Sequence, residues 1–240
     1  METEKKIPTH VSIIMDGNGR WAKGHGDERE EGHKAGVETV REVLTEACHL
    51  GIRYLSLYAF SEENWGRPEK EVHALMALML HCIKSETETM MKNGVRFRVL
   101  GNRQRLPDEL NASIDELEAT TAGNEQITLI IFLSYSGKWD ILQAAKKLAK
   151  EMVAKNASEE EIDQITIPDF SNLLVTAGVP DPDIILRTAG EQRISNYLLW
   201  QGAYSELIYT DVMWPDFNKE DFHAVLDEYA HRDRRYGKVK

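Results

Sequence analysis

The stretch His10-Val11-Ser12-Ile13-Ile14-Met15-Asp16-Gly17-Asn18-Gly19-Arg20-Trp21 sets our expectation for the fold. It begins with an apolar run that ends at Met15, as in a strand buried on both faces of a sheet. Asp16 then opens a turn that contains two glycines. A buried strand that feeds a glycine-rich turn is typical of α/β proteins, in which ligands bind beyond the carboxyl ends of parallel strands.

Outward from this stretch, helical and strand-like patterns alternate along the chain. We expect helices at 34–50, 68–93, 107–121, 139–155 and 219–235. We expect further strands at 52–60, 95–100, 127–133, 184–186 and 206–209. Short loops join these segments, and no linker-like break in composition divides the chain. The sequence therefore predicts one α/β domain over residues 1–240, with a central, mainly parallel sheet flanked by helices. Residues 1–8 are expected to be a flexible N-terminus, and 232–240 a C-terminal tail.

The composition is that of a globular protein, with 42% hydrophobic and 29% charged residues and a net charge of -11. Nucleic-acid binding is not expected, because the binding surfaces of such proteins are basic. No segment is apolar over the length that a membrane span needs, and residues 1–6 do not resemble a secretory signal. Cys48 and Cys82 lie in apolar helical patterns, as expected for buried free thiols in a reducing compartment. These features predict a cytoplasmic protein.

The turn after Met15 combines groups that suit a phosphate. Gly17 and Gly19 let backbone N–H groups approach an anion, and Arg20 offers a planar fork for phosphate oxygens. Asp16 would repel the same anion unless a hard cation such as Mg²⁺ lay between them. The alternative is an ordinary β-turn with a solvated carboxylate. The turn is not a Walker A loop, because the ending Gly-Lys-Ser/Thr is absent.

Basic and polar residues follow the turn and the next strand. Arg29 and His33 are one helical turn apart and would share a face near the turn, although the acidic residues around them also fit a plain solvated face. After the second strand, Asn64 could hold a substrate or relay a proton, and Arg67 could bind a phosphate. The alternative is a capping loop in which Arg67 pairs with Glu71.

A second cluster follows the strand at 184–186. Arg187, Arg193 and Ser195 lie around a glycine and form another candidate anion cradle. Glu206, further along, could serve a metal ion or end a strand. Two separate cradles predict two anionic groups bound at once, or one long polyanion.

Taken together, these segments resemble the undecaprenyl diphosphate synthase family of cis-prenyltransferases over almost the whole chain. The matching motifs are HVSIIMDGNGRWA (10–22), GHKAG (32–36), YAFS (58–61), ENW (63–65), RP (67–68), TAGN (121–124), ILRT (185–188), GE (190–191), RISN (193–196), LLWQ (198–201) and WPDF (214–217). The DDxxD motif of the all-helical trans enzymes is absent. Many matches in the same order are far more specific than any single glycine loop.

The resemblance implies an enzyme that adds isopentenyl diphosphate repeatedly, with new cis bonds, to an allylic diphosphate. The expected starter is farnesyl diphosphate, and the expected product is undecaprenyl diphosphate, a precursor of the lipid carrier for cell-wall polysaccharides. The resemblance also implies a homodimer that contacts the inner face of the membrane peripherally to release its product. In that dimer, the tail Arg235-Tyr236-Gly237 would reach a substrate site across the interface.

The resemblance assigns roles to matching residues. Asp16 would be the essential carboxylate that holds Mg²⁺, with Glu206 as a second metal-associated carboxylate, and Asn64 would accept the proton. The allylic diphosphate would bind to Gly17, Asn18, Gly19, Arg20, Trp21, Arg29, His33 and Arg67. The same substrate region would include Ser61, Glu62, Glu63 and Trp65. Isopentenyl diphosphate would bind to Arg187, Arg193, Ile194 and Ser195.

The growing product needs an apolar tunnel between the sheet and the helices. The residues that we expect to form its wall are Val72, Leu75, Met76, Met79, Leu80 and Ile83. The alternative is that this stripe is ordinary core, which is the commoner role of such a pattern.

Three departures from the family pattern leave details open. Gln192 replaces a metal-associated His of many relatives, and Ser134-Tyr135-Ser136-Gly137-Lys138 replaces Asn-Tyr-Gly-Gly-Arg. The acidic cluster around Arg29 is also unusual and is expected to tune diphosphate affinity. Two other functions remain as alternatives: an α/β phosphatase or nucleotide-binding enzyme with the same cradle, or a non-catalytic subunit of a heteromeric prenyltransferase. Such subunits tend to lose the loop aspartate and its basic companions, which are present here.

Overall fold

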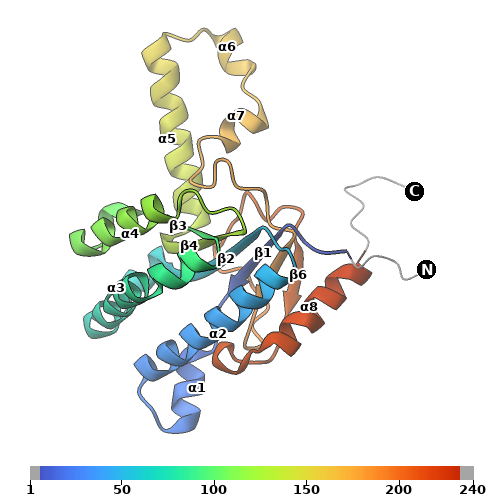
Figure 1. The fold of residues 1–240 in the computed structure, drawn as a ribbon. Helices are drawn as coiled ribbons and strands as arrows, with labels where there is room; N and C mark the ends of the chain where they lie inside the picture. The colour runs from blue at the N-terminus through green and yellow to red at the C-terminus, as the bar shows by residue number, and fades with distance from the viewer. Residues whose placement is uncertain (1–5, 233–240) are drawn as a thin grey trace.

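The computed structural model describes residues 6–232. Its centre is a six-stranded sheet with the order β3-β4-β2-β1-β5-β6, in which all neighbouring strands are parallel (Figure 1). The strands are β1 (His10–Ile14), β2 (Tyr54–Ser61), β3 (Val95–Leu100), β4 (Ile127–Tyr135), β5 (Ile184–Arg187) and β6 (Glu206–Tyr209). The predicted single α/β domain with a parallel sheet is confirmed.

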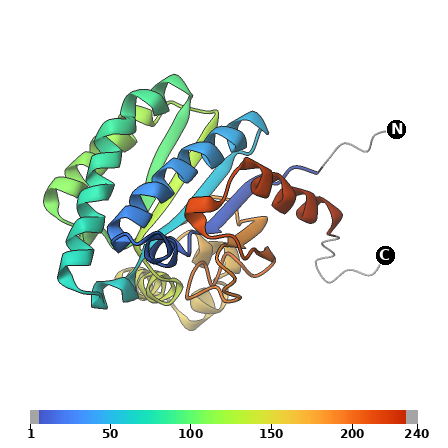
Figure 2. The ribbon, with the colours of Figure 1, turned by 90° about the horizontal axis from the view of Figure 1, so that it is seen from below.

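Helices cover both faces of this sheet. They are α1 (Asn18–His25), α2 (Arg29–His49), α3 (Glu69–Lys92), α4 (Asp108–Thr121), α5 (Gly137–Lys155), α6 (Glu159–Asp163), α7 (Ile167–Ser171) and α8 (Lys219–His231). Short 3₁₀ turns are η1 (Glu62–Gly66), η2 (Arg103–Arg105) and η3 (Trp214–Asp216). Figure 2 shows α2, α3 and α8 side by side on one face, with α5 behind the sheet. No helix of residues 6–232 is long and apolar enough to cross a membrane.

The strands bury side chains on both faces, which explains their nearly continuous apolar sequences. In β4, Leu129 and Ile131 belong to the core under α2, α3, α4 and α8. Their neighbours Ile130 and Phe132 belong to a second, smaller core on the opposite face. The second core contains a polar chain, since Ser12 Oγ donates to the Tyr197 hydroxyl at 2.8 Å.

Three details differ from the sequence-based prediction. The glycine turn is shorter than expected, because Gly17 alone reverses the chain with φ of 105° and α1 begins at Asn18. Helix α2 starts at Arg29, ahead of the predicted start, so its first turn carries Arg29 itself. The short helices α6 and α7 were not predicted, since each is a single capped turn with little apolar periodicity.

Candidate active site

The carboxyl ends of β1, β2 and β5 bring three predicted segments together. The strand register pairs Ile14 of β1 with Tyr58 of β2 and with Arg187 of β5. The residues that follow these strands therefore meet at one edge of the sheet, as expected for a parallel α/β fold. Asp16, Ser61 and Arg187 all line the same cavity at this edge.

The centre of this edge is an ion pair between Asp16 and Arg187. Arg187 Nη2 lies 2.8 Å from Asp16 Oδ2, and the Arg187 side chain is 6% exposed. Arg187 Nη1 donates to Ser195 Oγ at 2.6 Å and to the carbonyl oxygen of Arg193. The guanidinium fork therefore joins the two predicted anion cradles, which are one continuous polar surface.

The backbone of the Asp16 loop is held by two residues that the sequence analysis missed. Asp16 N–H donates to Thr188 Oγ1 at 2.9 Å, and Trp214 N–H donates to the carbonyl oxygen of Asp16 at 3.0 Å. Gly17 allows this close packing, since a Cβ there would lie 2.9 Å from the Cβ atoms of Ala189 and Met213. Thr188 directly follows Arg187, so its place after a strand was a usable signal. Trp214 is too far along the chain for any local pattern to show.

A second group of charges lies across the mouth of the cavity. Arg67 Nη1 is 3.0 Å from Glu71 Oε1, and Arg29 Nε is 3.4 Å from the same oxygen. His33 lies beside them, and burial, followed by the charges of Arg67 and Arg29, lowers the pKa of His33 to about 4. His33 is therefore neutral at pH 7 and can donate or accept a hydrogen bond. The Arg67–Glu71 pair proposed as the capping alternative is present, and it lies within the site.

The loop after β2 is a 3₁₀ turn tied to the end of β4. Asn64 lines the cavity, and its Oδ1 accepts the Ser61 N–H at 3.0 Å. Trp65 Nε1 donates to Ser134 Oγ at 2.8 Å, and Ser134 Oγ donates to Glu62 Oε1 at 2.5 Å. Ser134 has a φ of 53°, in the left-handed region that favours asparagine and glycine. Serine at this departure from the family pattern thus connects the loop after β2 to the sheet.

Arg105 completes this connection from outside the cavity. Its guanidinium lies 4.6 Å from the centre of the Trp65 ring and donates to Glu62 Oε2 at 3.0 Å. A cation over an indole face is a favourable contact. No sequence motif marks Arg105, which lies in the connection between β3 and α4.

The segment after β5 carries several strained residues. Ala189, Ser195, Asn196 and Leu198 all have positive φ values. Strained non-glycine residues of this kind cluster at functional sites. Asn196 Nδ2 donates to Glu63 Oε1 at 2.7 Å, which connects this segment to the loop after β2. Ser195 lines the cavity, whereas the side chain of Arg193 is 60% exposed and pairs with Glu191.

Arg20 and Trp21 lie at the rim. Arg20 donates to the carbonyl oxygen of Ala189 at 2.8 Å, which connects α1 to the segment after β5. Trp21 Nε1 donates to Asp216 Oδ1 at 2.6 Å, and its ring stacks on His25. The predicted residues that line the cavity are Asp16, Asn18, His33, Ser61, Asn64, Arg67, Arg187 and Ser195. Ten other predicted residues do not line the cavity but are close in sequence to lining residues or contact them: Gly17, Gly19, Arg20, Trp21, Arg29, Glu62, Glu63, Trp65, Arg193 and Ile194.

The structure does not place Glu206 in this site. Glu206 pairs with Ile184 in the register and so begins β6, whereas Arg187 lies at the other end of β5. Its carboxylate lies 2.9 Å from Arg232 Nη1. Within one chain Glu206 therefore lies away from Asp16, and it begins a strand rather than ending one. Its role as a metal-associated carboxylate stays a prediction.

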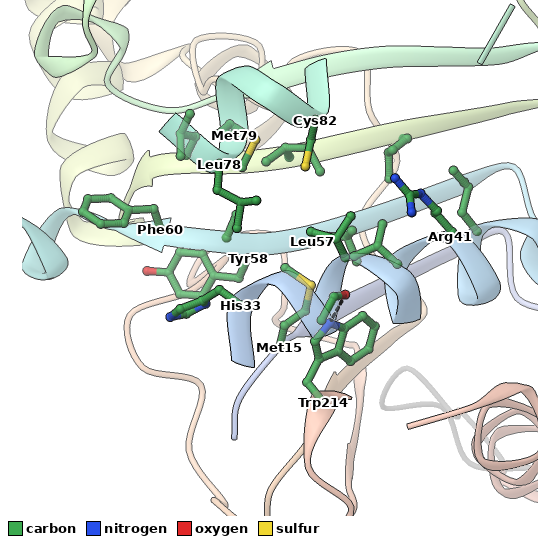
Figure 3. Close-up of a pocket in the computed structure, with 18 of the residues that line it drawn as sticks. Met15, His33, Arg41, Leu57, Tyr58, Phe60, Leu78, Met79, Cys82 and Trp214 are labelled. Carbon is green, nitrogen blue, oxygen red and sulfur yellow. Dashed lines mark hydrogen bonds between the residues drawn. The ribbon is translucent and has the colours of Figure 1, made fainter. Parts of the chain in front are cut away.

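The polar edge opens into a long cavity of about 610 Å³ between the sheet and helices α2 and α3 (Figure 3). Its walls include Val37, Val40 and Leu44 of α2 and Leu57, Leu129 and Ile131 of the sheet. Of the six predicted wall residues, Leu75, Met76, Met79 and Ile83 line the cavity. Val72 is buried core, and Leu80 faces a groove next to α4, so the stripe is partly wall and partly core.

Three buried polar atoms at the mouth have no hydrogen-bond partner within residues 6–232. They are Asn18 Oδ1, His33 Nε2 and Arg187 Nε. Buried polar atoms are normally paired, so such atoms around one cavity indicate a polar ligand. No group of three or more His, Cys, Asp or Glu side chains in this part of the chain could hold a metal by itself. Of the described residues, Asp16 is the one carboxylate that lines the mouth and could bind Mg²⁺. It would do so together with the phosphates of a ligand, which is a common arrangement for this ion.

Comparison with known proteins explains this combination of charged mouth and apolar cavity. A family described as "Putative undecaprenyl diphosphate synthase" matches residues 14–237. The chain belongs to the undecaprenyl diphosphate synthase family. The names of the family and of its members indicate a prenyl transferase.

Individual relatives within the family agree along almost their whole length. The chain is 45% identical over 233 residues to an isoprenyl transferase of Porphyromonas gingivalis, covering 97% of this chain and 91% of the relative. It is 43% identical to a ditrans,polycis-undecaprenyl-diphosphate synthase of Legionella pneumophila strain Paris, named as (2E,6E)-farnesyl-diphosphate specific, covering 98% and 97% of the two chains.

Solved structures of the family share the fold. Lavandulyl diphosphate synthase from Lavandula x intermedia, in complex with dimethylallyl diphosphate, matches with a TM-score of 0.91 and 33% identity, covering 96% of this chain and 98% of that one. A probable undecaprenyl diphosphate synthase from Campylobacter jejuni matches with a TM-score of 0.79 and 28% identity, covering 97% of this chain and 100% of that one.

Proposed function

We propose that this chain condenses isopentenyl diphosphate repeatedly onto farnesyl diphosphate to make a long-chain cis-polyprenyl diphosphate, undecaprenyl diphosphate. The observation that carries the proposal is the opening of the Asp16–Arg187 edge into an apolar cavity of about 610 Å³. A diphosphate would bind at the charged edge while its hydrocarbon tail fills the cavity. The Legionella relative, which is named for farnesyl diphosphate, supports the choice of starter.

We assign the allylic diphosphate to the α1–α2 side of the mouth. Asn18 and His33 each offer an unpaired buried atom there, and Arg29 and Arg67 provide positive charge. As the allylic C–O bond breaks, negative charge grows on the leaving diphosphate. Prearranged cations and N–H donors stabilise such charge without reorganising. Mg²⁺, held by Asp16 and the phosphates, would supply further charge stabilisation.

We assign isopentenyl diphosphate to the side formed by β5 and the strained segment after it. Arg187 and Ser195 face the cavity there, and Arg187 Nε has a free donor. The double bond of this substrate attacks the allylic carbon as the diphosphate leaves. The cation that results then loses a proton. Asn64, whose side chain is oriented by its hydrogen bond with Ser61, is our candidate for the group that accepts or relays this proton.

The proposal extends to the assembly and location of the protein. We propose a cytoplasmic homodimer that contacts the membrane peripherally, where its lipid product is needed. The tail Arg235-Tyr236-Gly237, predicted to reach across the dimer, lies outside the described residues. Sedimentation of the full chain would test the dimer, and flotation with vesicles of anionic phospholipid would test the membrane contact.

The apolar cavity also separates this proposal from the two alternatives. A phosphatase or nucleotide-binding enzyme with the same polar edge would have no use for a long hydrocarbon cavity behind it. A non-catalytic subunit would not need the charged mouth, yet Asp16, Arg20, Asn64 and Arg67 are all present.

Incubation of the folded protein with farnesyl diphosphate, labelled isopentenyl diphosphate and Mg²⁺, followed by chromatography of the lipids, tests the proposal. We expect labelled polyprenyl diphosphates of increasing length. Release of inorganic phosphate without elongation, or protection of the protein by nucleotides with no lipid product, would support the phosphatase or nucleotide alternative instead.

A further inference from the structure

One charged pair interrupts the apolar wall of the cavity. Arg41 of α2 donates through Nε to Glu86 Oε1 of α3 at 3.0 Å, and its Nη2 bonds to the same oxygen. Both residues line the cavity. The pair therefore joins the two helices that form the wall opposite the sheet. In Figure 3, Arg41 lies toward one end of the lined region and His33 toward the other, with Leu57 between them.

The pair lies far from the reacting end of the cavity. Glu86 is about four helical turns beyond Glu71 of the mouth, roughly 22 Å along α3. Between them the cavity face of α3 is formed by Leu75, Met76, Leu78, Met79, Cys82 and Ile83. Past the pair the lining is mixed: the polar residues Thr45, His49, Thr89, Asn93 and Gln126 alternate with apolar ones such as Met90, Val95 and Phe97. Within residues 6–232, the Arg41–Glu86 pair is thus the one ion pair that the growing tail meets along the α2–α3 wall, at the depth where a continuous apolar wall becomes mixed.

A hydrocarbon tail that advances past this depth gains less stabilising apolar contact. Burying each further apolar group stabilises the complex only where the wall is apolar. At the pair, the tail would have to remove water from two charges, or separate them and leave an unpaired charge beside hydrocarbon. The Glu86 side chain is 17% exposed and that of Arg41 is 45% exposed, so Glu86 is the member of the pair that lies deeper in the wall.

We propose that the Arg41–Glu86 pair limits product length by closing the cavity to the growing tail. This inference rests on the proposed function, and it assigns a specificity role to two residues that take no part in the chemistry. Elongation stops when the tail reaches the pair, since the next isoprene unit no longer gains apolar contacts.

Product length tests this directly. The double variant Arg41→Met/Glu86→Leu removes both charges and leaves the net charge unchanged. With farnesyl diphosphate and labelled isopentenyl diphosphate, we expect its main product to be longer than the wild-type product by at least one isoprene unit. The rate of the first condensation should stay within about twofold of wild type, because the pair is remote from the mouth. The exchanged variant Arg41→Glu/Glu86→Arg should restore the wild-type distribution.

Lys84→Gln is the matched control. Lys84 pairs with Glu109 of α4 at 2.7 Å and does not line the cavity, so its loss should leave product length unchanged. A folded Arg41→Met/Glu86→Leu variant with the wild-type product distribution would overturn the proposal, as would an equal shift in the control.

A second readout does not depend on turnover. Cys82 lies in the cavity one turn before Glu86 on α3. In a Cys48→Ser background, opening the cavity at the pair should speed alkylation of Cys82 by N-ethylmaleimide about threefold or more, because thiol reactivity depends on access. If the protein elongates no substrate, the proposed function fails while this measurement still tests closure. An unchanged alkylation rate in the double variant would contradict closure by the pair.

Discussion

Arg187 and Asp16, which lie far apart in the sequence, form a 2.8 Å ion pair at the carboxyl ends of adjacent strands. The same guanidinium bonds Ser195 and the Arg193 carbonyl oxygen, so one side chain organises both halves of the site. The Asp16 carboxylate is thereby oriented at the mouth of the cavity.

Arg187→Lys tests the fork geometry. A lysine ammonium is a compact charge and cannot bond Asp16 and Ser195 as two prongs of one planar group. Losing one or two charged hydrogen bonds corresponds to roughly a 10- to 100-fold increase in KM for isopentenyl diphosphate. Affinity for the allylic substrate should change much less. Steady-state kinetics on both substrates would show this.

Arg103→Lys serves as the control for that substitution. Arg103 also uses a fork, to Asn111 and Asp115, but it lies outside the cavity. We expect its kinetics to match wild type. If Arg187→Lys raised the KM values of both substrates equally, the division of the mouth into two substrate sides would be wrong.

Ser134→Ala tests the connection between the substrate loop and β4. It leaves Trp65 Nε1 and Glu62 Oε1 each without a partner, although Arg105 still pairs with Glu62 Oε2, at a cost of about 1–3 kcal/mol in unfolding free energy. We also expect a higher KM, because the loop that carries Asn64 is held less firmly. Urea unfolding and steady-state kinetics measure the two effects.

Ser136→Ala is the comparison from the same segment. Ser136 caps α5 by accepting from Trp139 N–H, so its loss should cost about 1 kcal/mol of stability. The KM values of the Ser136→Ala variant should match those of wild type. Equal KM changes in both variants would show that the loop responds to general destabilisation and not to the Ser134 contacts.

Because His10 is buried and neutral, we expect the free energy of unfolding to fall in mild acid. Nδ1 of this buried ring faces the Pro180 carbonyl oxygen at 2.7 Å, and Nε2 lies 2.8 Å from Ser56 Oγ. Burial lowers the pKa of His10 to about 4, although Pro180 and Asp183 partly oppose the shift. The folded pKa is below the unfolded value, so the unfolded chain binds the proton first. Stability is therefore complete above about pH 6.5 and falls as the pH drops toward 4.

Urea unfolding at pH 7 and pH 5 measures the contribution of His10. From these pKa values, His10 should account for about 2 kcal/mol of the loss between the two conditions. His10→Gln should remove that part of the pH dependence, whereas substitution of the exposed His81 by Gln should not. If the unfolding free energy of His10→Gln fell between pH 7 and pH 5 as much as that of wild type, His10 would not be neutral and buried.

Much of the fold could be predicted because its signals are local. The apolar runs at β1 and β4 and the glycines that end helices are visible within short windows, so the parallel sheet and the strand-end site followed directly. Asp16, Asn64, Arg67 and Arg187 were found because each follows a strand. The family resemblance then ordered their expected roles.

The remainder depends on contacts between distant segments. Thr188 and Trp214 hold the Asp16 loop, and Glu71 contacts Arg29 as well as Arg67. Thr188 and Trp214 stand in family motifs, and the Arg67–Glu71 pair was expected, but local sequence does not show that these residues meet Asp16 and Arg29. Motif position suggested a metal role for Glu206, whereas strand register places it at the start of β6, at the opposite end of the strands from Asp16; its metal role stays a prediction. Which members of the α3 stripe face the cavity was decided by packing alone.

The most direct measurement compares single-turnover condensation by wild type and Asp16→Asn. Asparagine keeps the size of the side chain but removes the charge that pairs with Arg187 and would hold Mg²⁺. We predict that the rate with farnesyl diphosphate and isopentenyl diphosphate falls roughly 100-fold or more, while farnesyl diphosphate still binds with near wild-type affinity. Wild type should also stop with EDTA and recover with added Mg²⁺. A near wild-type rate in folded Asp16→Asn, or full activity in EDTA, would contradict the account.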